Sequence, residues 1–258
     1  MSDSMPFPDG AKFKAKEREM SSTLPARTFA VIRFDGKNFS TFTKRYAKPY
    51  DETFMAAMDE TTRKMVASIP GAVLGYTQSD EISIVFSDLS TAKTQMWFGG
   101  RVEKMLTLGA ALTTARFIAE SSTVDESTPP IFDARVHTLA DADEVQEYVR
   151  WRRFDAQKNS VTMAAGVLFS HNQLKGVPSR ERLRLLEGTE YARLPEGFYN
   201  GRVTYSESYR QPLAEVVPPE FMDMPRKDKS GTVARKRWLT APATREFMEQ
   251  QLPGLLAL

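Results

Sequence analysis

The sequence predicts an α+β protein built on a ferredoxin-like βαββαβ unit. Three observations support this prediction: short apolar runs rich in β-branched and aromatic residues, long segments with helical periodicity, and the order in which the two alternate between about residues 25 and 140. Two right-handed crossovers would lay both helices on one face of a four-stranded antiparallel sheet. This unit is assigned to residues 13–140, and residues 141–258 are expected to form a mainly helical extension with a small hairpin, packed on it.

The elements of the first unit have clear boundaries. Residues 29–35 form an apolar run, which predicts a buried strand. A helix over 51–69 begins at the N-cap residue Asp51 and ends before Pro70-Gly71. Residues 96–119 predict a second helix. Apolar, β-rich runs predict the remaining strands at residues 72–77, 81–87 and 132–139.

The second half reads differently. Helical patterns cover residues 143–170 and 179–187, and Asn200-Gly201 predicts the turn of a hairpin in EGFYNGRVTYSE. Loop-like stretches, in which Pro, Ser, Asp and Gly cluster, are expected at residues 1–12, 120–131 and 216–232.

Composition excludes several kinds of chemistry. The 258 residues include no cysteine, so disulfides, thiolate nucleophiles and the common zinc modules are ruled out. Two histidines, far apart, leave little for a histidine-based triad. No apolar run approaches the ~20 residues of a membrane span, so a cytoplasmic protein without a membrane partner is expected. Any catalysis therefore rests on carboxylates, cations or a metal.

Carboxylates are predicted to meet at one edge of the sheet. In this topology the first and third strands are antiparallel neighbours, so Asp35 at the end of one lies beside Asp80 and Glu81 at the start of the other. Converging carboxylates repel each other, and a hard dication such as Mg²⁺ between them relieves the repulsion. The carbonyl of Gly36 offers one more oxygen, and such a site can hold two ions. The alternative is that Asp-Gly and Ser-Asp-Glu are ordinary turn sequences.

Basic side chains near helix starts predict contacts with phosphate groups. Arg101 and Lys104 are three residues apart, so they share a helix face that suits a triphosphate, unless it is simply solvent-exposed. Lys48 lies in the loop before Asp51, where a helix N-terminus favours anions. On the third helix, a stripe of side chains is either part of a site or a set of core anchors and caps: Tyr148, Trp151, Asp155, Asn159 and Thr162.

Several ordered blocks together resemble one enzyme family. They read VIRFDGKNFSTFTKRYAKPYDETF, GYTQSDEISIVF, FDARVHTL and YVRWRRFDAQKNSVTMAA. Over roughly residues 13–190 the chain is similar to the tRNA-histidine guanylyltransferase family, in particular to its bacterial guanylyltransferase-like members. The resemblance implies a polymerase-like palm, in agreement with the order of elements. It also implies 3′-to-5′ nucleotide addition at the 5′ end of tRNA, and a homotetramer.

The resemblance implies roles for individual residues. Asp35, the carbonyl of Gly36 and Asp80 would hold two Mg²⁺ ions, and Glu81 would be a further catalytic carboxylate. Asp155 and Asn159 match supporting positions. ATP would activate a 5′-monophosphate, and GTP or another nucleotide would then displace AMP. The residues implied in nucleotide or phosphate binding are Lys37, Asn38, Phe39, Lys48, Asp51, Ser79, Arg101 and Lys104.

Departures from the family pattern bear on the substrate. QKNSVTM follows Asp155 where the guanylyltransferases proper have a histidine and two amides, Ser40 replaces a common histidine, and Glu187 stands where many members have lysine. These changes favour template-dependent repair of 5′-truncated tRNA. The basic segment 224–238 is expected either to contact RNA phosphates or to be a solvated tail. The alternatives are guanylate addition to tRNA-histidine, a palm-fold nucleotidyl cyclase, and an RNA-binding protein without catalysis.

Overall fold

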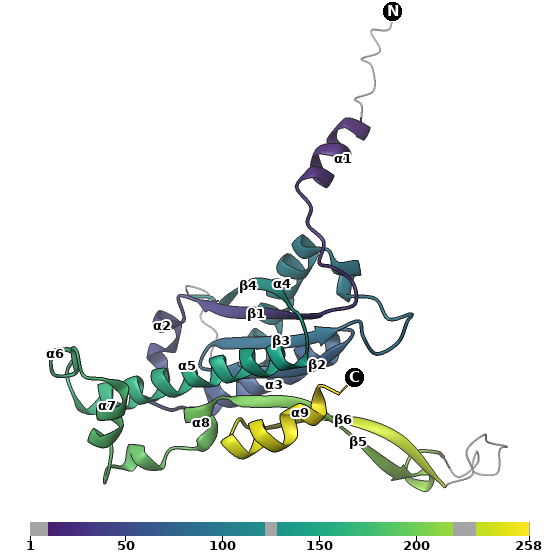
Figure 1. Ribbon diagram of the computed structural model, residues 1–258. Coiled ribbons are helices and arrows are strands. Elements are labelled where there is room, and N and C mark those ends of the chain that lie inside the picture. Colours follow the sequence, from purple (N-terminus) through teal and green to yellow (C-terminus); the bar gives the residue numbers. More distant parts are fainter. Residues whose placement is uncertain (1–9, 122–127, 219–230, 258) are drawn as a thin grey trace, which may run out of the picture.

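A six-stranded antiparallel sheet forms the centre of the molecule, with strand order β4-β1-β3-β2-β5-β6 (Figure 1). The computed structural model describes residues 10–121, 128–218 and 231–257. The four strands of the predicted unit are present in the ferredoxin-like order: β1 (Phe29–Lys37), β2 (Ala72–Gln78), β3 (Glu81–Ser87) and β4 (Ile131–Leu139). Two further strands, β5 (Arg202–Pro212) and β6 (Thr232–Pro242), widen the sheet beyond β2. The α+β palm-like fold is therefore confirmed, with more strands than expected.

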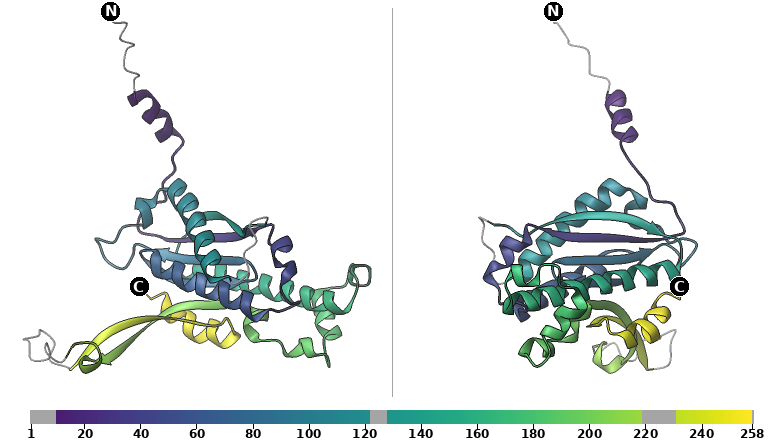
Figure 2. Two further views of the ribbon diagram at one scale, coloured as in Figure 1. Left: turned by 180° about the vertical axis from the view of Figure 1, so that it is seen from behind. Right: turned by 60° about the vertical axis from the view of Figure 1, so that its left-hand side comes forward.

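The two helices of the unit, α3 (Glu52–Ser68) and α4 (Val102–Glu120), cover one face of the sheet (Figure 2). Asp51 caps α3 as predicted, since its side chain accepts a hydrogen bond from the Phe54 N–H at 3.0 Å. The predicted start of the second helix at residue 96 was too early. Phe98 and Gly99 have positive φ angles of 51° and 63°, which no α-helix contains, so α4 begins only after them.

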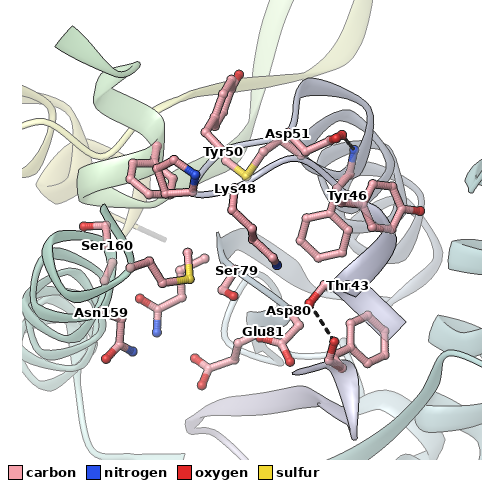
Figure 3. A pocket seen from close by; sticks show the side chains of 18 of the residues that line it. Thr43, Tyr46, Lys48, Tyr50, Asp51, Ser79, Asp80, Glu81, Asn159 and Ser160 are labelled. Carbon is pink, nitrogen blue, oxygen red and sulfur yellow. Dashed lines mark hydrogen bonds between the residues drawn. The ribbon is translucent and has the colours of Figure 1, made fainter. Parts of the chain in front are cut away.

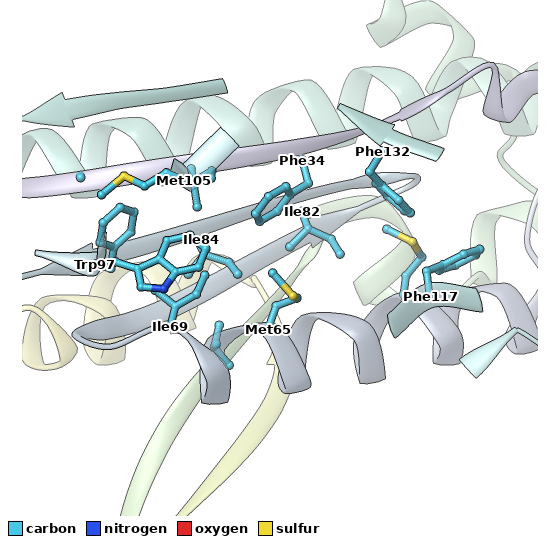
Figure 4. Close-up of a cluster of buried hydrophobic side chains, with 14 of the residues drawn as sticks. Phe34, Met65, Ile69, Ile82, Ile84, Trp97, Met105, Phe117 and Phe132 are labelled. Atoms are coloured by element: carbon cyan, nitrogen blue, oxygen red, sulfur yellow. The ribbon is translucent and has the colours of Figure 1, made fainter. Parts of the chain in front are cut away.

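The first four residues of β1 are apolar and buried because both faces of the strand are covered there. Ala30, Ile32 and Phe34 belong to the core beneath α3 and α4, where Figure 4 shows Phe34. Phe29 and Val31 point the other way, into a second core that includes residues of α5 (Ala142–Leu168). Alternating side chains of one strand thus enter two cores, which explains the continuous apolar run.

The rest of the chain adds helices around this frame. The long helix α5 confirms the prediction for 143–170, and α7 (Ser179–Leu185) confirms the one for 179–187. The remaining α-helices are short: α1 (Gly10–Glu19), α2 (Phe39–Phe42), α6 (His171–Leu174), α7 (Ser179–Leu185), α8 (Glu196–Asn200) and α9 (Leu252–Leu255). In the described ranges, no helix is both long and apolar enough to cross a membrane.

The predicted hairpin turn at Asn200-Gly201 was wrong. Asn200 ends α8, and Gly201, with φ 72°, passes the chain directly into β5. The strand pairs with β2 on one side and with β6 on the other, and β5 and β6 form a long two-stranded ribbon (Figure 1). Of the predicted loops, residues 1–9, 122–127 and 219–230 lie outside the described residues.

Candidate functional site

The ends of β1 and β3 bring the predicted carboxylates together. Asp35 pairs directly with Glu81 across the two strands. The Gly36 N–H donates to the carbonyl of Asp80 at 3.1 Å, which ties the end of β1 to the turn before β3. Ser79, with φ 46°, makes the sharp turn that carries Asp80 to this edge. The juxtaposition deduced from topology is therefore observed, although 45 positions separate Asp35 from Asp80 (80 − 35).

Asp80 lies in an environment that disfavours its charge. Burial raises the pKa of the Asp80 carboxyl, and the negative charge of Asp35 raises it further. A hydrogen bond from Ser79 and the positive charge of Lys48 oppose this. A carboxylate held ionised here needs a compensating cation nearby.

The donor set fits a hard dication. Asp35, Asp80 and the Gly36 carbonyl supply only oxygen atoms, and the described residues contain no cluster of three or more His, Cys, Asp or Glu side chains that would form a complete protein cage. Mg²⁺ prefers to bind only a few protein oxygens and to leave its other coordination positions to water and phosphate oxygens. The edge is thus suited to Mg²⁺ together with a phosphorylated substrate.

Glu81, expected as a further catalytic carboxylate, is engaged with two arginines. Both of its oxygens accept hydrogen bonds from Arg152 of α5, at 2.8 Å each, and Arg33 lies 3.8 Å away. The Arg152 side chain is only 5% exposed. Such a bidentate buried pair fixes geometry, so Glu81 fastens α5 to the sheet edge, and with Asp35 and Asp80 it also lines a cavity.

Asp155 completes this connection. Its Oδ2 accepts hydrogen bonds from Arg152 at 3.0 Å, Asn159 at 3.3 Å and Gln78 at 3.4 Å. Arg152 and Gln78 were missed in the sequence. Arg152 had a usable signal, because it lies three residues before Asp155 and so shares its helix face; Gln78 offered none beyond its place in the QSDE block.

A cavity of about 660 Å³ opens at this edge (Figure 3). Its walls come from α2, the loop before α3, the turn between β2 and β3, and α5. The predicted residues that line it are Asp35, Phe39, Lys48, Asp51, Ser79, Asp80, Glu81, Asp155 and Asn159. Its volume lies in the range of small-molecule sites.

Lys48 points into the cavity toward Asp80 (Figure 3). Burial lowers the pKa of its amine, while the charges of Asp51 and Asp80 oppose that shift. Asp51 holds the loop that carries Lys48: its carboxylate accepts from the N–H groups of Ala47 at 2.9 Å and Phe54 at 3.0 Å. The cation is thus fixed to the start of α3.

The other predicted residues next to Asp35 differ in whether they reach the cavity. Lys37 and Asn38 are exposed and are not among the residues that line the cavity. Phe39 is buried, with 2% of its surface exposed, and packs so close to Gly36 that an added Cβ atom would lie 2.5 Å from its Cγ. Gly36 is therefore needed for this close approach.

Arg101 and Lys104 are not brought to the cavity, contrary to expectation. Arg101 bridges to Thr23, and the Val102 N–H donates to the carbonyl of Ser22 at 2.9 Å. These contacts lie before the start of β1, at the end of the sheet opposite Asp35. Because β3 runs away from the carboxylate edge, the helix that follows it begins at the far end. Within one chain, the two cations cannot share a phosphate group with Lys48.

The comparisons with known proteins agree with this geometry. Residues 12–140 match a family model described as tRNAHis guanylyltransferase. Among curated relatives, a tRNA(His) guanylyltransferase of Neurospora crassa is 27% identical and covers 76% of this chain and 72% of its own length. An uncharacterized protein of Acanthamoeba polyphaga mimivirus is 28% identical, with 70% of each chain covered. A guanylyltransferase of Arabidopsis thaliana is 26% identical, but the match spans only 37% of it.

Solved structures are similar over almost the whole chain. A bacterial tRNA(His) guanylyltransferase-like protein in complex with ATP has a TM-score of 0.79 and 28% identity, and the match covers 97% of this chain and 100% of that one. The complex of such a protein with GTP has a TM-score of 0.74 and 27% identity, with 96% and 99% covered. The chain therefore belongs to the tRNAHis guanylyltransferase family, a family of nucleotidyltransferases.

Proposed function

We propose that the protein is a Mg²⁺-dependent 3′-to-5′ nucleotidyltransferase that adds nucleotides to the 5′ end of tRNA. The observation that carries the proposal is the convergence of Asp35 and Asp80 at the mouth of a cavity that also holds Lys48. Phosphoryl transfer requires carboxylates that bind the metal ions and a cation that binds the phosphate groups. The ATP and GTP complexes of similar bacterial proteins support nucleotides as substrates.

Asp35, Asp80 and the Gly36 carbonyl would hold two Mg²⁺ ions. When bound, Mg²⁺ supplies positive charge that stabilises the attacking and leaving oxygens of a displacement at phosphorus. Lys48 binds the phosphates of the nucleotide, and Asp51 keeps the Lys48 loop against α3. Glu81 positions α5 through Arg152, so that Asp155 and Asn159 form the opposite wall.

Two displacements at phosphorus make up the proposed reaction. The 5′-monophosphate of the RNA attacks the α-phosphorus of ATP and pyrophosphate leaves. The 3′-hydroxyl of an incoming nucleotide then attacks the 5′-phosphorus and AMP leaves. Both reactions need the same charges in the same places, so one site serves both.

The RNA side of the proposal rests on the ribbon. Arg235, Lys236 and Arg237 follow one another on β6, and Arg237 lies over the ring of Tyr209 at 5.3 Å. Cations on an extended ribbon suit the phosphates of an RNA helix. Residues 224–230 of the predicted basic segment lie outside the described residues. We further propose templated repair of 5′-truncated tRNA, with guanylate addition to tRNA-histidine as the alternative, and a cytoplasmic homotetramer.

The test is nucleotide addition to a 5′-monophosphorylated tRNA that lacks its first nucleotide, with ATP, GTP and Mg²⁺. Asp35→Asn and Asp80→Asn should each lower the rate by several powers of ten, because each replaces a charged metal ligand with a neutral amide and weakens metal binding that is worth several kcal/mol. Arg101→Gln is a control for a general loss of charge. Unchanged activity in both aspartate variants would refute the metal site. A cyclic nucleotide product would favour a cyclase, and RNA binding without extension would favour a non-catalytic protein.

A further inference from the structure

Trp151 is an exposed aromatic side chain at the edge of the candidate site. It lies on α5 in the same stripe as Tyr148, but the two have different surroundings. Tyr148 is 6% exposed and its hydroxyl hydrogen-bonds Ser83 at 2.8 Å, so it is a core anchor. Trp151 is 53% exposed. An indole left in water next to a catalytic edge is not explained by packing.

Two guanidinium groups pack against the indole. The Arg152 Cζ lies 4.4 Å from the ring centroid and the Arg33 Cζ 5.9 Å from it. Both arginines also contact the carboxylate of Glu81, so the groups packed against the ring are themselves held in place. About half of the Trp151 side chain, 53%, nevertheless stays exposed.

The indole does not line the cavity itself, but its neighbours on α5 and β1 do. Asp155, one helical turn after Trp151, lines the cavity. Arg33, beneath the ring, is two residues before Asp35 and points to the same face of β1, which places the two Cα atoms ~7 Å apart. The exposed ring of Trp151 therefore lies close to the carboxylates that would hold Mg²⁺ at the reacting phosphate.

We propose that Trp151 is a stacking platform for the unpaired nucleobase at the reacting end of the RNA. The proposal rests on the proposed function, because it assumes that the reacting end of an RNA lies at Asp35. A flat aromatic ring supported by guanidinium groups is the surface on which unpaired bases stack, and the arginines attract the adjoining phosphates. Covering of the ring by a second copy of the chain is the competing outcome that the experiment separates from RNA binding.

The experiment measures binding of two labelled RNA hairpins by fluorescence anisotropy, with neither nucleotide nor divalent cation present. One hairpin lacks its 5′-terminal nucleotide and so leaves the opposing base unpaired; the other is blunt. Wild-type protein should prefer the first hairpin. Trp151→Ala should weaken its binding by about 5-fold to more than 100-fold, the range measured for loss of one base–aromatic stack, and should leave the blunt hairpin almost unaffected.

Two further variants separate stacking from other roles. Trp151→Phe keeps an aromatic ring and should restore most of the preference. Phe154→Ala removes a neighbouring aromatic side chain that is 75% exposed and should change binding less than 2-fold. Equal weakening of both hairpins by Trp151→Ala would overturn the proposal. The proposal would also be overturned if Phe154→Ala weakened binding as much as Trp151→Ala does and also changed the oligomeric mass measured by light scattering.

The outcomes distinguish this proposal from the proposed function. Suppose that the wild-type protein adds no nucleotide, but that it prefers the hairpin with the unpaired base and Trp151→Ala does not. The stacking proposal then stands and the catalytic proposal fails. If the wild-type protein adds nucleotides and Trp151→Ala keeps the wild-type KM for the truncated RNA, the platform fails and the catalytic proposal stands.

Discussion

Replacing Gly36 with alanine would show how tightly the carboxylate edge is packed. The added Cβ atom would lie 2.5 Å from Phe39 Cγ, whereas nonbonded carbon atoms prefer about 3.5–4.0 Å. The ring of Phe39 would therefore have to move by about 1 Å. It has little room, because it is 2% exposed and four neighbouring aromatic rings have centroids 4.9–6.4 Å from its own.

Overpacking of a filled core costs about 1–3 kcal/mol, and the crowding around Phe39 places Gly36→Ala at about 2–3 kcal/mol. For a chain of this size, that lowers the melting temperature by roughly 4–12 °C. Thermal and urea unfolding of the metal-free protein measure it. Gly166→Ala is the matched control: it lies in α5, no atom comes within 4 Å of its added Cβ, and it should be stabilising by up to about 1 kcal/mol.

The double variant Gly36→Ala/Phe39→Leu checks the cause. A smaller side chain at position 39 makes room for the new methyl group, so the two changes should be non-additive by at least about 1 kcal/mol. If Gly36→Ala unfolds at the wild-type temperature, or if the two changes simply add, the close contact between Gly36 and Phe39 does not determine the packing of this edge.

Two other predictions concern binding. Burial lowers the pKa of Lys48, so its charge is lost at a lower pH than the ~10.4 of an exposed lysine. Nucleotide affinity should therefore fall as the pH rises toward that value. In Lys48→Arg, which stays charged, affinity should not fall over the same pH range. A fall of equal size in both proteins would contradict this. On the ribbon, Lys236→Ala should reduce the slope of log affinity for tRNA against log salt concentration by about 0.7–0.9 if its amine contacts one phosphate. An unchanged slope would remove Lys236 from the RNA surface.

Local signals in the sequence were enough to predict the central unit. The apolar run of β1, the cap at Asp51 and the order of elements each reflect short-range physics, and the handedness of crossovers leaves few ways to assemble them. The convergence of Asp35 with Asp80 followed from that topology alone. The same topology also decides the position of Arg101: the helix after β3 must begin where β3 ends, away from the carboxylates.

What the sequence did not reveal depends on contacts between distant segments. Asn200-Gly201 is a typical hairpin-turn sequence, yet the strand that follows it, β5, pairs with β2, more than 120 residues earlier. No local pattern in the sequence predicts such a pairing. Likewise Arg152 is an ordinary helical arginine until folding places it, 71 positions from Glu81, against that carboxylate. Its role is created by burial.

The continuity of the sheet has a practical consequence for dissecting the protein. A fragment ending at residue 140 would leave the β2 edge without β5, and would uncover the face of the sheet to which Val31 and Val85 contribute. An open edge beside an apolar face invites association between copies. Such a fragment would also lack the wall formed by Asp155 and Asn159, so the smallest autonomous unit extends well past the residues that carry the metal ligands.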